Sequence, residues 1–69
     1  MNAKPCIIRR RMVGNSGIFD AFNEDGRFVF ALFDYENLSR YVEAQGYEVV
    51  PLNSRCGRTI LDKVNGEQV

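Results

Sequence analysis

The fold is decided by the stretch IFDAFNEDGRFVFALFDYENLSRYVEAQGYEVV, residues 18–50. Two runs rich in aromatic and β-branched residues, 18–22 and 27–33, flank Asn23-Glu24-Asp25-Gly26, which suits a type I turn followed by a left-handed glycine. The pattern predicts a β-hairpin. Two registers are open: Phe22 lies opposite Arg27 or, if the glycine forms a bulge, opposite Phe28.

The second strand of this hairpin is apolar toward both sides of the sheet. Side chains alternate along a strand, so the two sides of the sheet are expected to carry different residues of this run. One side carries Phe28, Phe30 and Leu32, and the other side carries Val29, Ala31 and Phe33. The bulkier first trio is assigned to the core.

A helix is predicted from Tyr35 to Gln45. Asp34 is a good N-cap, apolar residues recur at helical spacing, and Gly46 suits the left-handed position after a helix. Residues 47–52 then read as a strand that returns to the same sheet, and Pro51 either ends this strand or places it at a sheet edge.

The flanking segments are less regular. Residues 1–5 are expected to be a flexible lead-in, and Cys6–Met12 a first strand at a sheet edge, because its three successive arginines point to both faces. Residues 13–17 read as a loop. In the tail, Ile60, Leu61 and Val64 favour a short helix, with a short strand at 59–61 as the alternative, and residues 65–69 are expected to fray.

These elements predict one small α+β domain over residues 1–69. Its order is β-β-β-α-β, with an antiparallel sheet of three to four strands, one amphipathic helix on one face and a short C-terminal element. One short helix can cover only one face of such a sheet, so the other face is expected to be bare and to bind a partner.

The amino-acid composition argues against several classes of function. Nine basic residues balance nine acidic ones, so no net field attracts nucleic acid or an anionic membrane. The chain has no histidine, the usual general base and zinc ligand. No catalytic, metal or cofactor motif stands out, so a protein that is not an enzyme and carries no cofactor is expected. No apolar run is long enough to span a membrane, and a soluble cytoplasmic protein is expected.

The two cysteines, Cys6 and Cys56, show no metal-binding or redox spacing, and their sequence positions leave pairing open. Cys56 lies between Arg55 and Arg58, and nearby arginines lower the pKa of a thiol. A reactive cysteine is therefore an enzymatic alternative. The favoured interpretation of residues 54–59 is a surface loop that turns the chain or contacts a partner.

The favoured function is a small protein-binding module, an inhibitor or adaptor of a larger protein of the kind that phages or mobile elements encode. Homodimerisation through the same face is a close variant. The candidate binding residues combine an apolar face with arginine anchors: Arg9, Arg11, Val29, Ala31, Phe33, Arg55 and Arg58.

The alternative function is binding of DNA or RNA by the hairpin and Arg9-Arg10-Arg11. Three strands followed by a helix, residues 6–46, resemble in outline the small arm-type DNA-binding domains of integrases. Those domains are usually strongly basic on the exposed sheet, whereas this hairpin carries Asp20, Glu24 and Asp25. The protein-binding interpretation is therefore preferred.

Overall fold

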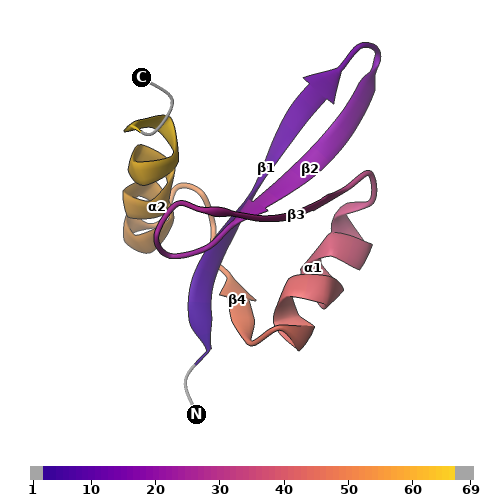
Figure 1. The fold of residues 1–69 in the computed structure, drawn as a ribbon. Coiled ribbons are helices and arrows are strands. Elements are labelled where there is room, and N and C mark those ends of the chain that lie inside the picture. Colours follow the sequence, from indigo (N-terminus) through magenta and orange to yellow (C-terminus); the bar gives the residue numbers. More distant parts are fainter. Residues whose placement is uncertain (1–2, 67–69) are drawn as a thin grey trace.

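The computed structural model describes residues 3–66, which form four strands and two helices in an α+β fold, as predicted. In chain order they are β1 (Lys4–Val13), β2 (Ser16–Phe22), β3 (Phe28–Leu32), α1 (Tyr35–Ala44), β4 (Tyr47–Val49) and α2 (Arg55–Gly66). The two helices lie on opposite sides of a twisted sheet, and the β1–β2 hairpin extends beyond both helices (Figure 1).

The sheet has the strand order β3-β2-β1-β4. It is a mixed sheet, whereas the sequence predicted an antiparallel one. β1 pairs with β2 and β2 with β3 in antiparallel fashion, whereas β4 runs parallel to β1. The reason is the connection through α1, which carries the chain from one edge of the sheet to the other. A crossover of this kind joins strands that run in the same direction.

The ends of α1 lie close to the predicted positions. Asp34 is the N-cap residue, with extended backbone, and its carbonyl oxygen accepts a hydrogen bond from the Leu38 amide at 3.1 Å, although its side chain makes no capping bond. Gly46 adopts φ 93°, the left-handed conformation expected after the helix. The chain then enters β4, which is shorter than the predicted strand.

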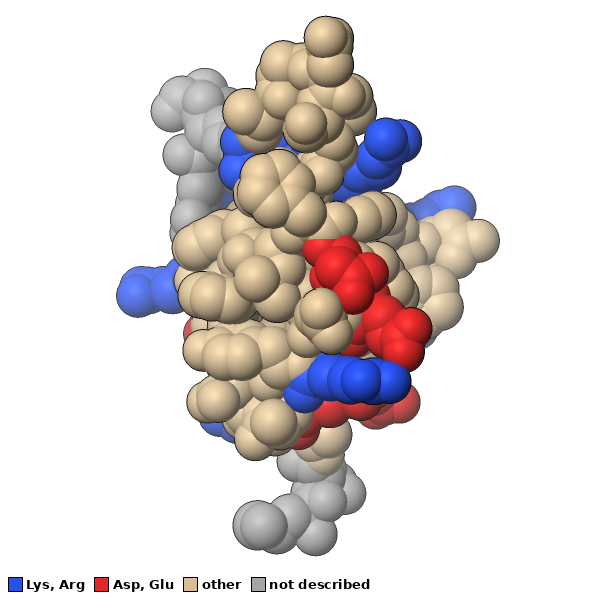
Figure 2. All heavy atoms as spheres, turned by 90° about the vertical axis from the view of Figure 1, so that its right-hand side faces the viewer, with Lys and Arg blue, Asp and Glu red and all other residues tan. Residues whose placement is uncertain are grey.

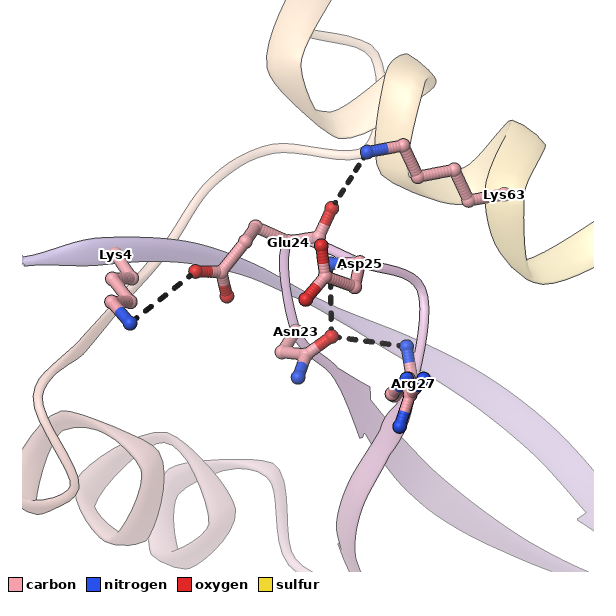
Figure 3. Close-up of polar contacts among 6 residues, drawn as sticks. All are labelled: Lys4, Asn23, Glu24, Asp25, Arg27 and Lys63. Carbon is pink, nitrogen blue, oxygen red and sulfur yellow. Dashed lines mark hydrogen bonds and ion pairs between the residues drawn. The ribbon is translucent and has the colours of Figure 1, made fainter.

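The turn between β2 and β3 is held by one side chain. The Asn23 side-chain oxygen accepts hydrogen bonds from the amides of Asp25 (2.9 Å) and Arg27 (3.0 Å), and Gly26 adopts φ 79° (Figure 3). Asparagine is favoured in turns because its side chain can replace a backbone acceptor in this way. The predicted turn with a left-handed glycine is confirmed.

Two lysines from distant segments meet at Glu24 in the same turn (Figure 3). Lys63 of α2 donates a hydrogen bond to the Glu24 carbonyl oxygen at 3.1 Å, and the Lys4 ammonium lies 3.8 Å from the Glu24 carboxylate. Gly26 sits beneath the same helix, since a Cβ atom there would lie 2.7 Å from the Lys63 Cβ. The turn therefore packs directly against the last turns of α2.

Buried residues form two clusters, one on each face of the sheet. On the α1 side they are Cys6, Ile8, Ala21, Leu38 and Val42. On the α2 side they are Ile7, Phe22, Ile60 and Val64. Successive residues of β1 thus feed opposite clusters, as strand alternation requires. The expectation of a bare second face is wrong, because α2 covers the part of that face formed by β1 and the end of β2.

Helix α2 confirms the predicted tail helix but starts earlier than predicted, so residues 55–59 are helical and not a loop. The Ser54 hydroxyl accepts a hydrogen bond from the Gly57 amide at 3.0 Å and donates one to the Pro51 carbonyl oxygen at 2.6 Å. A side chain at Gly57 would collide with that same carbonyl. Of the tail expected to fray, residues 65 and 66 belong to α2, and residues 67–69 lie outside the described part.

The assignment of the bulkier trio to the core is wrong for Phe28 and Phe30, whereas Leu32 does pack against the cluster beneath α1. Phe22 lies opposite Phe28 while the neighbouring Ala21 lies opposite Phe30, so β3 contains one extra residue, Val29, at a bulge. The bulge puts Phe28 and Phe30 on opposite faces. Both are exposed, because β3 is an edge strand and α1 is short.

Strand β1 differs from its predicted form at both ends. It begins at Lys4, within the predicted lead-in, and pairs there with Tyr47 of β4. Pairing with β4 ends at Cys6, while pairing with β2 continues to Val13. The first part of the strand therefore pairs with β4, and the second part, which contains Arg9, pairs with β2.

Candidate interaction surface

Four aromatic side chains lie exposed where β3 and α1 meet. Phe30 in β3 is 38% exposed, Phe33 in the connection 66%, and Tyr35 and Tyr41 in α1 46% and 39%. Phe28, near the start of β3, is 59% exposed, so five of the eight aromatic residues of the chain face solvent. We call the first four residues the aromatic seam.

Three of the four seam side chains make aromatic contacts. The Phe30 and Tyr41 rings stack with centroids 4.5 Å apart, and Tyr35 makes an edge contact with Phe19 at 5.5 Å. Phe19 in turn packs against the buried cluster beneath α1. Aromatic rings fixed in this way lose little conformational freedom when a partner covers them.

Charges adjoin the seam on one side. Figure 2 shows the α1 side of the molecule as a broad surface without charged side chains, bordered by a strip of acidic and basic groups. Glu36 and Arg40 of α1 form an exposed ion pair at 2.7 Å. An apolar centre with a polar border is the usual arrangement of a protein-binding surface.

The three successive arginines of β1 have separate environments. Arg11 makes a two-pronged contact with Asp20, with Nε 2.7 Å and a terminal nitrogen 3.2 Å from the carboxylate oxygens. Asp20 is buried, and this hydrogen bond raises the pKa of Arg11. The Arg9 guanidinium lies 5.1 Å from the Phe22 ring centroid, and that of Arg10 lies over Gly17.

The other predicted binding residues do not lie on a single face. Val29 is half-buried and packs against the cluster beneath α1, and Ala31 is half-buried opposite Asp20. Phe33 is exposed in the seam. The two remaining arginines, Arg55 and Arg58, are exposed on α2, which packs mainly on β1.

The thiols are free and differ in environment. Cys6 is fully buried, and burial, followed by the charges of Glu43 and Glu24, raises its pKa to about 11. Cys56 is exposed near the start of α2. Among residues 3–66, no group of three or more histidine, cysteine, aspartate or glutamate residues could hold a metal ion.

Sequence reasoning missed most of the seam. It assigned Phe30 to the core and named neither Tyr35 nor Tyr41 as a binding residue. A usable signal was present: Tyr35 and Tyr41 flank the buried positions Leu38 and Val42, so they lie at the borders of the buried stripe of α1.

Searches with the whole chain add no further assignment. No helix in the described part is long and apolar enough to cross a membrane. Comparison with protein-family models, with curated proteins and with solved structures found no match to this chain.

Proposed function

We propose that this protein is a small, non-enzymatic protein-binding module that acts as an inhibitor or adaptor of a larger protein. The observation that carries the proposal is the aromatic seam, which is exposed and in which Phe30 stacks on Tyr41 and Tyr35 contacts Phe19. Large aromatic side chains are enriched among the residues that dominate binding energy at interfaces. The proposal places the module in the cytoplasm, where thiols stay reduced.

The seam replaces the sheet face as the proposed contact surface. Phe33 is kept from the predicted set as the most exposed aromatic residue of the seam. Val29 and Ala31 are not part of the proposed contact surface, because both are half-buried in this chain. Pairing of two copies through the seam is the nearest variant of the same proposal.

The test compares a seam variant with a matched surface variant. Phe33→Ser combined with Tyr41→Ser removes two of the four seam side chains. Leu52→Ser removes an apolar side chain that is 38% exposed and does not belong to the seam. A protein captured from the native host by the wild-type chain is then purified and titrated by calorimetry. The double variant is expected to weaken binding at least about 30-fold, as loss of one hot spot of 2 kcal/mol would.

Equal affinity for the wild-type chain and the double variant would overturn the proposal, and so would an equal loss caused by Leu52→Ser. Light scattering on the free protein separates the homodimer variant, because a wild-type dimer that the double variant converts to a monomer would identify a second copy as the partner.

A further inference from the structure

The second part of β1 has an unpaired edge. Pairing between β4 and β1 extends from Lys4 to Cys6. The last hydrogen bond between the two segments is donated by the Val50 amide to the Cys6 carbonyl oxygen, at 2.9 Å. Pro51 follows, and the chain turns away toward α2. Within the described residues 3–66, β1 is therefore hydrogen-bonded on one side only, to β2, from Arg9 to Val13.

The backbone groups on this edge follow from alternation along the strand. The Lys4 amide and the Cys6 carbonyl both point toward the β4 side. In a strand, the backbone amide and carbonyl groups of every second residue point to the same side. The amide and carbonyl groups of Arg10 and Met12 therefore also point away from β2. These backbone groups continue the edge of β1 along which β4 pairs, beyond the point where β4 ends.

The side chains beside this edge carry positive charge on both faces. Arg9 lies on the α2 face, with Phe22, whereas Arg10 lies on the α1 face, opposite Phe19. Within residues 3–66 neither has a carboxylate within ion-pair distance, while Arg11 is neutralised by Asp20. β1 itself contains no acidic residue.

We propose that this edge binds an extended, acidic peptide segment of another protein, which adds to the sheet as a strand beside β1. Main-chain bonds to Arg10 and Met12 would supply affinity, and carboxylates opposite Arg9 and Arg10 would supply selectivity. A second copy of this chain fits poorly, because antiparallel pairing of two such edges places four arginines without an acidic partner, Arg9 and Arg10 of each copy, in one ladder. Like charges opposite each other destabilise a strand pair.

The edge is a different surface from the aromatic seam, so the two proposals can fail separately. The probe is the fluorescent octapeptide Thr-Val-Thr-Glu-Glu-Thr-Val-Thr, titrated with the full chain by anisotropy. Two control peptides are its Lys-Lys counterpart and the acidic peptide N-methylated at alternate residues, which keeps its charge but cannot form a ladder. Amide chemical shifts of the labelled protein identify where the peptide binds.

Arg9→Gln with Arg10→Gln is expected to weaken binding of the acidic peptide about tenfold, since it removes both ion pairs with the peptide carboxylates. Arg40→Gln with Arg58→Gln removes the same charge elsewhere and is expected to leave affinity unchanged. Both control peptides are expected to bind at least tenfold more weakly, with amide shifts concentrated at residues 9–13.

Three results would each overturn the proposal. The first is equal binding of the N-methylated peptide, which would mean charge attraction without strand addition. The second is a shift pattern centred on Phe30 and Tyr41, which would place the peptide on the seam. The third is tighter binding of an oligonucleotide of equal charge to the same arginines, which would identify nucleic acid as the ligand of this edge.

Discussion

Shortening Ile60 to alanine tests whether α2 is a structural part of the domain. Ile60 is 2% exposed and lies in the cluster with Ile7, Phe22 and Val64. Ile→Ala substitutions in cores cost about 2–5 kcal/mol, because apolar contact is lost and a cavity is left. A chain of this length has a total stability of roughly 3–10 kcal/mol. Ile60→Ala is therefore expected to remove about half of the free energy of unfolding.

The assay is urea and thermal unfolding of the wild-type chain and three variants. Ile60→Ala is expected to lower the melting temperature by about 10–30 °C, since 1 kcal/mol corresponds to about 4–8 °C in a domain of this size. Ile60→Val should cost only about 0.5–1.5 kcal/mol. Asp62→Ala, on the exposed side of the same helix, should change stability by less than about 0.5 kcal/mol. If Ile60→Ala unfolded like Asp62→Ala, the packing of α2 on the sheet would be refuted.

Three further outcomes are expected. Gly26→Ala should destabilise the chain by about 1–3 kcal/mol in urea unfolding, because its backbone is left-handed and its Cβ would meet α2; an unchanged midpoint would contradict that contact. The raised pKa of Cys6 contributes stability that is complete below the ordinary thiol value of 9.0 and is lost as pH rises through about 11. Unfolding free energy should therefore fall over that range in wild type but not in Cys6→Ala, and only Cys56 should react rapidly with a thiol reagent in the folded protein. Arg11→Gln should lower the urea midpoint more than Arg10→Gln does, because it leaves the buried Asp20 carboxylate without its cation; equal midpoints would argue against the ion pair.

Local signals in the sequence predicted the elements well. The turn needs an acceptor side chain and a left-handed glycine, and Asn23 and Gly26 supply both. Helix α1 is delimited by Asp34 and Gly46, which act within one turn of the chain. Such signals depend on neighbouring residues only, and for that reason they can be read without knowledge of the tertiary structure.

The faces of the sheet could not be predicted in the same way. A single extra residue, Val29, reverses which side Phe28 occupies relative to Phe30, and nothing in the local sequence requires a bulge there. The start of α2 was missed because it depends on Ser54, whose hydroxyl accepts a hydrogen bond from the Gly57 amide in the first turn of the helix. Because residues 54–59 were interpreted as a loop, the helix was predicted too short to cover the second face.

The same two errors displaced the predicted site. With the second face taken as bare, Val29 and Ala31 were predicted as contact residues, whereas both are half-buried in this chain. The exposed aromatic residues lie at the rim of the sheet, where β3 is the edge strand and α1 no longer covers the sheet. The open surfaces of this fold are thus its rims: the aromatic seam and the second part of β1.

Amide hydrogen exchange along β1 tests most directly the claim that a helix packs on each face of the sheet while the rims stay open. The amides of Arg9 and Arg11 bond to β2 in the observed register and are expected to exchange slowly. The amides of Arg10 and Met12 are expected to exchange fast in the free protein. Slow exchange at all four would contradict the account, because it would mean that this edge is already covered.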